Sequence, residues 1–231
     1  MRVRVNLGLA FNHTYNNRDT MNTAMIWGAS GGIGQALTDT LLNRDWEVIG
    51  LARNTDNVHP NAKLAIEVDI GNAFSVQSAI LSASYEVDRV DLSIYAIGDI
   101  LSAKIDQLEP DKWDQTLNAN LTGAYLTTHY GLPLLAEDAG LIYIGAVSER
   151  LRLPGLSAYA AAKSGLEAFV DTVRKEQRRR SVMLVRPGAV NTPLWDKIPM
   201  RLPKDAADPG KAAERIIGAY LNEYQGVLDL T

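Results

Sequence analysis

The chain has 231 residues, of which 46% are hydrophobic, and a formal net charge of −4. This length and apolar content suit one globular domain, and the slight acidity excludes the basic surface that nucleic-acid binding requires. The sequence contains no cysteine, which excludes disulfides and thiolate chemistry, and no apolar run reaches the ~18 residues of a membrane-spanning helix. We therefore expect a cytoplasmic domain that binds neither nucleic acid nor membranes.

Residues 1–20 are set apart from the rest of the chain by a polar stretch that begins at Asn12. We expect a disordered tail here, or a start codon assigned upstream of Met21; a targeting role is the smaller alternative. The domain is expected to span residues 21–231.

From residue 23 onward, short apolar runs alternate with longer segments of helical periodicity. The first half predicts strands at 23–27, 47–52, 64–68 and 90–96, with helices at 32–44 and 73–85. The second half predicts helices at 113–135, 157–178 and 210–223, with strands at 141–145, 182–186 and 226–230. Seven strands interleaved with helices indicate an α/β fold of the doubly wound, Rossmann type, with helices on both faces of a parallel sheet. Such sheets bind ligands at the carboxyl ends of their strands.

A glycine-rich turn directly follows the first predicted strand. It runs Gly28-Ala29-Ser30-Gly31-Gly32-Ile33-Gly34 and opens a helix with an apolar face. Closely spaced glycines let the backbone approach a pyrophosphate, and the N-terminal amides of a helix favour anions. The spacing is wider than G-x-G-x-x-G, so a simple packing turn is the alternative. The position between a strand and a helix favours a dinucleotide site.

The second predicted strand ends at Arg53. Dinucleotide-binding folds place here either an acid that contacts the ribose 2′-hydroxyl or an arginine that accommodates a 2′-phosphate. An arginine without a carboxylate predicts NADP (NADPH) as cofactor in preference to NAD. The alternatives are that Arg53 is a solvated loop charge and that Asp69, after the third strand, is only a strand-end cap.

Tyr159 and Lys163 stand four residues apart on a predicted helix and therefore on one helical face. A phenol can protonate the oxygen of a carbonyl that receives a hydride, and a neighbouring ammonium should lower its pKa from about 10 into a useful range. This pair predicts oxidoreductase chemistry. An ordinary amphipathic surface is the alternative.

Several ordered motifs resemble those of the short-chain dehydrogenase/reductase family between Thr23 and Leu230. Besides the glycine turn and the Tyr159/Lys163 pair, they are Asp69-Ile70, Tyr95-Ala96-Ile97-Gly98 where the family usually has Asn-Asn-Ala-Gly, Asn120-Leu121-Thr122-Gly123, and Pro187-Gly188-Ala189-Val190-Asn191-Thr192. The resemblance implies hydride transfer between a nicotinamide cofactor and a small carbonyl/alcohol pair, and pairing through the helices at 113–135 and 157–178 into a homodimer or homotetramer.

The resemblance also assigns roles to individual residues. Tyr159 becomes the acid/base, Lys163 also holds the nicotinamide ribose, and Asn120 supports a water in a proton relay. The remaining cofactor-binding positions are Gly28, Ser30, Gly31, Gly32, Ile33, Gly34, Arg53, Asp69, Ile70, Ala96, Gly98, Pro187, Gly188, Val190 and Thr192.

One departure from the family pattern concerns catalysis. The family usually has a serine 13 residues before the tyrosine, and this position is Ala146. Ser148 is the nearest hydroxyl that could replace it as a donor to the substrate oxygen. Trp27, where the family usually has threonine, is a smaller departure. The alternative function is therefore a dinucleotide-binding regulatory or interaction protein whose catalysis is weak or lost.

The segment 193–203 mixes apolar and basic residues after the sixth strand, and we expect it to form a mobile lid over a partly apolar substrate. Arg150 and Arg152 could attract an acidic substrate, although solvated loop charges are the favoured interpretation. His13, His59 and His129 lack metal-ligand spacing, so no metal site is expected.

Overall fold

The computed structural model describes residues 21–230, so the expectation for residues 1–20 lies outside the described part. A single sheet of seven parallel strands has the order β3-β2-β1-β4-β5-β6-β7. The strands are β1 (Thr23–Trp27), β2 (Glu47–Ala52), β3 (Leu64–Glu67), β4 (Val90–Tyr95), β5 (Leu135–Ile144), β6 (Ser181–Pro187) and β7 (Gly226–Leu230). The α-helices are α1 (Gly32–Leu42), α2 (Ala73–Ser84), α3 (Pro110–Leu117), α4 (Gly123–Gly131), α5 (Ser157–Glu176) and α6 (Pro209–Leu221). The predicted α/β, doubly wound class is confirmed.

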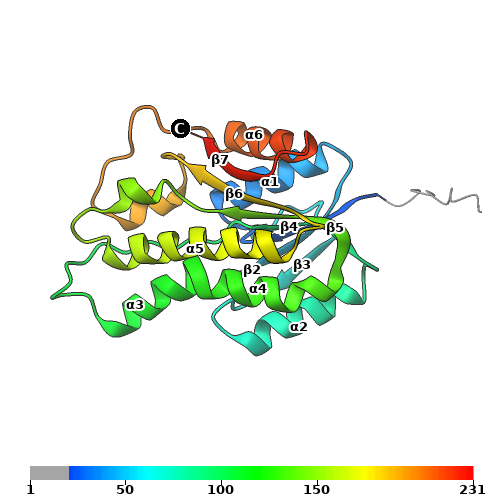
Figure 1. Ribbon diagram of the computed structural model, residues 1–231, viewed down its shortest axis with the longest axis horizontal. Coiled ribbons are helices and arrows are strands. Elements are labelled where there is room, and N and C mark those ends of the chain that lie inside the picture. Colours follow the sequence, from blue (N-terminus) through cyan, green and yellow to red (C-terminus); the bar gives the residue numbers. More distant parts are fainter. Residues whose placement is uncertain (1–20, 231) are drawn as a thin grey trace, which may run out of the picture.

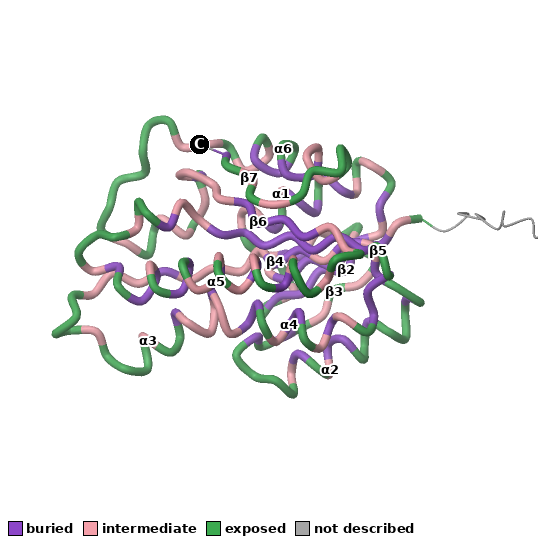
Figure 2. Tube along the Cα trace, viewed as in Figure 1, coloured by how far each residue is buried: buried purple, intermediate pink, exposed green. Residues whose placement is uncertain are grey.

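Helices cover both faces of the sheet (Figure 1). Helices α1 and α6 pack together on one face, while α2, α4 and α5 cover the other. Successive residues of a strand point to opposite faces, so β1 contributes Met25 and Trp27 to one core and Ala24 and Ile26 to the other. The inner strands of the sheet are buried and the outer faces of the helices are exposed (Figure 2). No helix in the described residues is long and apolar enough to span a membrane.

The predicted continuous helix over 113–135 is wrong in one respect, because a π-helical turn, η1 (Asn118–Thr122), separates α3 from α4. The hydroxyl of Tyr95 donates a hydrogen bond to the carbonyl of Ala119 at 2.8 Å. In a regular α-helix that carbonyl would accept from the amide of Gly123, which here donates to the carbonyl of Asn118 instead. A side chain from β4 thus enters the helical hydrogen-bond ladder and widens the turn.

The end of this helical region also differs from the prediction. Helix α4 stops at Gly131, a 3₁₀ turn η2 (Leu132–Leu134) follows, and β5 already begins at Leu135 rather than at 141. A register shift in the pairing of β4 with β5 accompanies this early start. Helical periodicity had continued through the apolar residues that in fact begin the strand, because short apolar runs do not by themselves distinguish the two structures.

Candidate active site

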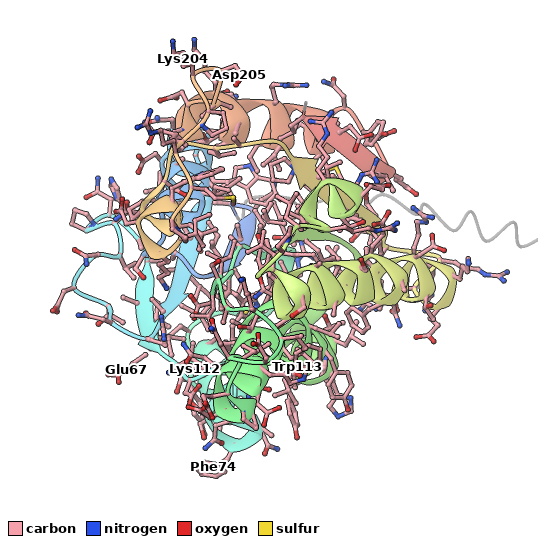
Figure 3. All side chains as sticks on the ribbon, turned by 90° about the vertical axis from the view of Figure 1, so that its left-hand side faces the viewer. Glu67, Phe74, Lys112, Trp113, Lys204 and Asp205 are labelled. Carbon is pink, nitrogen blue, oxygen red and sulfur yellow. The ribbon has the colours of Figure 1, made fainter. Side chains whose placement is uncertain are left out.

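A cavity of about 760 Å³ lies at the carboxyl ends of the strands, where the loops after β1, β4, β5 and β6 converge. Figure 3 looks toward this end of the molecule: the segment with Lys204 and Asp205 projects at the top, and Lys112 and Trp113 of α3 lie below. The cavity lining contains both members of the Tyr159/Lys163 pair and most of the predicted cofactor positions. The sheet therefore brings together motifs that are far apart in the sequence.

The glycine turn packs tightly between β1 and α1. Gly28 has a φ of +91°, a conformation that side chains other than glycine rarely adopt, and a Cβ at Gly34 would lie 2.0 Å from the carbonyl oxygen of Gly28. Gly31 precedes the first turn of α1 without a side-chain cap, so the amides at this helix start are available to an anion. The cavity is lined by Ser30, Gly31, Gly32 and Ile33, whereas Gly28 and Gly34 lie outside the lining and contact each other closely within the turn.

The loop after β6 closes the other side of this turn. A Cβ at Gly32 would lie 2.8 Å from Cγ2 of Thr192. Pro187, Gly188, Val190 and Thr192 all line the cavity, as do Ala96 and Gly98 after β4 and Arg53 after β2. A dinucleotide bound at the glycine turn would therefore be flanked by the protein chain on both sides.

Asp69 and Ile70, which the resemblance assigned to the cofactor, are not among the residues that line the cavity. The carboxylate of Asp69 accepts a hydrogen bond from the amide of Gly71 at 3.0 Å, and Ile70 is buried in the core beneath α2 and α4. This contact fits the strand-end cap that the sequence left as the alternative for Asp69, and the cofactor roles of Asp69 and Ile70 stay predictions.

Tyr159 and Lys163 lie on the first turns of α5, which begins at Ser157. Both side chains are buried and both line the cavity. The Lys163 ammonium lies 5.7 Å from the centre of the Tyr159 ring and donates a hydrogen bond to the carbonyl of Ile144 at 3.0 Å. No hydrogen bond joins the Tyr159 hydroxyl to another of the described residues, so this donor is open to a ligand.

The pKa values of Tyr159 and Lys163 differ from the expectation. Burial raises the pKa of Tyr159 to about 12, and burial lowers the pKa of Lys163 to about 8. The predicted lowering of the phenol pKa by the ammonium does not prevail, because desolvation penalises both charged forms. The phenol therefore carries its proton at neutral pH, as a proton donor must.

Asn120 lies on the π-helical turn η1 and is completely buried. Its Nδ2 donates to the carbonyls of Asp99 at 2.6 Å and Thr116 at 2.8 Å, but its Oδ1 has no partner among the described residues. A Cβ at Gly98 would lie 3.5 Å from this Oδ1 and 3.9 Å from Nζ of Lys163. The missing side chain of Gly98 thus leaves an acceptor and an ammonium facing the same small space.

Ser148 does not replace the serine missing at Ala146. Ala146 lines the cavity, but Ser148 lies outside the lining, and its hydroxyl donates to the carboxylate of Glu167 at 3.0 Å. Glu167 in turn contacts Arg186 on β6, which also binds Glu149 and Asp229. The expectation that Ser148 supplies the donor is corrected: this ion-pair network turns the hydroxyl away from the cavity.

Apolar side chains pack against Tyr159. Ile100, Leu151, Leu156, Leu194 and Ile198 pack with Tyr159 in one cluster. The predicted lid contributes part of this wall, with Trp195 anchored by a hydrogen bond from its Nε1 to the carbonyl of Val190 at 2.9 Å. No sequence pattern pointed to Ile100 or Leu151, since both lie in segments without strand or α-helix periodicity.

Two polar contacts at the cavity, one of them charged, were also not predicted. Lys197 of the lid forms an ion pair with Asp99 after β4 at 2.6 Å, and Gln35 of α1 donates to the carbonyl of Asn57 at 3.1 Å. Arg150 lines the cavity, whereas Arg152 does not. Within residues 21–230, no cluster of three or more potential metal ligands occurs.

Comparisons with known proteins find relatives of this chain by sequence and by fold. The family model described as short chain dehydrogenase matches residues 22–202. An uncharacterised oxidoreductase of Schizosaccharomyces pombe is 30% identical over 178 residues, which are 75% of this chain and 69% of the relative. The 3-amino-tetrahydro-pyrrolizinone reductase of Xenorhabdus hominickii is 27% identical over 187 residues, which are 77% of this chain and 65% of that reductase.

Solved structures share the fold at low sequence identity. An alcohol dehydrogenase from Thermococcus sibiricus, solved with 5-hydroxy-NADP, aligns with a TM-score of 0.82 at 22% identity over 91% of this chain and 96% of that one. A 3-ketoacyl-(acyl-carrier-protein) reductase from Brucella melitensis, solved with NADH, aligns with a TM-score of 0.79 at 21% identity over 90% of this chain and 96% of that one. By its sequence motifs, its fold and its family match, the chain belongs to the short-chain dehydrogenase/reductase family of oxidoreductases.

Proposed function

We propose that the protein is an NADP-dependent oxidoreductase that interconverts a small carbonyl compound and its alcohol, with Tyr159 as general acid/base. The observation that carries the proposal is the buried Tyr159/Lys163 pair in the cavity that also contains the glycine turn. The cofactor would supply the hydride, and the chain would supply orientation and the proton.

The residues present fit a dinucleotide. The uncapped start of α1 suits the pyrophosphate, and the guanidinium of Arg53 suits the 2′-phosphate that distinguishes NADP from NAD. Pro187, Gly188, Val190 and Thr192 would hold the nicotinamide end beside Tyr159. No aspartate or glutamate among residues 21–230 lines the cavity to repel these phosphates.

In the reducing direction, the Tyr159 hydroxyl would donate its proton to the substrate oxygen as negative charge develops there. The raised pKa of Tyr159 keeps that proton in place at neutral pH. Lys163, still mostly cationic below its pKa of about 8, would stabilise the phenolate left behind. The unpartnered Oδ1 of Asn120 and the nearby Nζ of Lys163 would bind a water that returns a proton to Tyr159.

The test is consumption of NADPH and of NADH across a panel of aldehydes, ketones and quinones. Tyr159→Phe should lower turnover by at least about 100-fold and leave the affinity for NADPH nearly unchanged. Arg53→Gln should weaken NADPH binding by about tenfold and spare NADH, since it removes a charge-assisted contact to the 2′-phosphate alone. Equal affinity of the wild type for the two cofactors would refute the NADP preference.

A second candidate function, a dinucleotide-binding regulatory or interaction protein, is favoured by Ala146. Neither Ala146 nor Ser148 offers a hydroxyl to the substrate oxygen, and one such donor contributes about 2.7–4 kcal/mol to catalysis. Tight NADPH binding without turnover of any carbonyl, unchanged by Tyr159→Phe, would establish this alternative.

We further propose a homodimer or homotetramer that pairs through α4 and α5, and a cytoplasmic location. Helix α4 exposes Tyr125, an aromatic residue that suits an interface. Light scattering of the wild type and of Tyr125→Glu tests the assembly, since a charge in a packed interface should dissociate it. Cell fractionation tests the location.

A further inference from the structure

All four charged side chains that line the cavity from residues 21–230 are cationic: Arg53, Arg150, Lys163 and Lys197. This composition is unusual for the chain, in which 27 acidic residues outnumber 23 basic ones. Cations gathered in a cleft of low dielectric attract anionic ligands. The phosphates of a dinucleotide explain why a cation, Arg53, lies on the glycine-turn side of the cavity. They do not explain Arg150 and Lys197, the cations on the substrate side.

Of the two cations on the substrate side, Arg150 alone lacks a partner among the described residues. The ammonium of Lys197 is bound by Asp99 at 2.6 Å, whereas the guanidinium of Arg150 makes no hydrogen bond or ion pair with a described residue. Glu149 and Asp229, the acids near Arg150, both bind Arg186. The five donors of Arg150 are thus free to bind a carboxylate in forked geometry.

The position of Arg150 also relates it to the reacting atoms. It lies in the 3₁₀ turn η3 (Ser148–Leu151), whose last residue, Leu151, packs against the apolar cluster around Tyr159. The Ser148 hydroxyl donates to Glu167, and Glu149 accepts from Arg186, so this turn is tied to α5 and β6. The apolar cluster therefore contains both the phenol, where a carbonyl would react, and Leu151, the chain neighbour of Arg150, which also lines the cavity.

Building on the proposed function, we propose that the substrate is an apolar carbonyl compound with a carboxylate at the end remote from the carbonyl, and that Arg150 binds this carboxylate. Arg150 is then a specificity-determining residue. The apolar body of the substrate lies against Leu151, Leu156 and Ile198.

A matched pair of rigid probes tests the proposal: 4-carboxybenzaldehyde and its neutral methyl ester, each with saturating NADPH. The wild type should show a kcat/KM about tenfold higher for the acid, as expected for one charge-assisted contact at an exposed arginine. Arg150→Gln should abolish this preference by reducing activity on the acid alone. The control Arg152→Gln, an exposed arginine two residues away and outside the cavity, should retain it. High salt should reduce the preference of the wild type, because the guanidinium is exposed.

Calorimetric titration of the NADPH-bound protein with the two probes separates this inference from the proposed function. If the wild type binds the acid more tightly than the ester, Arg150→Gln loses this difference, and neither probe is turned over, the inference is supported and the enzymatic proposal is contradicted. Turnover of both probes with equal kcat/KM in the wild type supports the enzymatic proposal and overturns the inference. A preference for the acid that survives in Arg150→Gln also overturns it.

Discussion

Replacing Lys163 by methionine should make the free energy of unfolding respond differently to pH. Lys163 is 4% exposed, and burial lowers its pKa from the ordinary 10.5 to about 8. A shift of this size means that burying the ammonium costs roughly 3 kcal/mol at neutral pH, at about 1.4 kcal/mol for each pKa unit. Methionine has a similar length and carries no charge to desolvate.

The sign follows from proton counts. Between about pH 8 and 10.5 the unfolded chain holds a proton on Lys163 that the folded chain has lost, so stability of the wild type rises with pH there. Below about pH 8 both states are protonated and the cost is constant. From about pH 7 to about pH 10, the wild type should therefore gain roughly 2–3 kcal/mol relative to Lys163→Met. The raised pKa of Tyr159 affects both proteins and cancels in the difference.

Urea unfolding of both proteins at several pH values in this range provides the measurement. Lys104→Met, at an exposed lysine, is the control, and its difference from the wild type should not vary with pH. If the difference between the wild type and Lys163→Met varies by less than about 0.5 kcal/mol over this range, Lys163 is not desolvated. The buried geometry of the pair, and the roles inferred from it, would then be refuted.

Three further predictions concern the site and its frame. Ala146→Ser should raise kcat/KM on a carbonyl substrate at least about tenfold by restoring a donor to the substrate oxygen, and an unchanged rate would show that the position does not contact it. Tyr95→Phe should remove the hydroxyl that widens the π-helical turn and reduce kcat about tenfold. The control is Tyr143, another buried tyrosine whose hydroxyl is hydrogen-bonded. Tyr143→Phe should lower the free energy of unfolding by about 1 kcal/mol and leave activity unchanged. Gly34→Ala should abolish NADPH binding or folding in fluorescence and thermal-melt assays because its methyl group meets a backbone oxygen, while Gly218→Ala, with open space around it, should have little effect on either.

The parallel sheet with helices on both faces, and the location of the site at the carboxyl ends of its strands, could be predicted from the sequence. Alternation of apolar runs with helical segments specifies a parallel sheet, because only crossover helices connect parallel strands and cover both faces. The glycine turn and the spacing of Tyr159 and Lys163 are local patterns, so they too can be read along the chain. Their meeting in one cavity follows from the fold class.

Other features depend on partners that are distant in the sequence. The π-helical turn at Asn120 exists because the hydroxyl of Tyr95, on β4, donates a hydrogen bond to a carbonyl of the helix. No local sequence pattern predicts that contact. Ser148 turns outward because its hydroxyl donates to Glu167, which also binds Arg186, and Arg150 forms no ion pair with a described residue because Arg186 binds the nearby carboxylates. Burial, rather than the neighbouring charge, sets the pKa values of Tyr159 and Lys163. Sequence spacing determines which residues share an element, but only tertiary packing decides which polar groups are paired and which are removed from water.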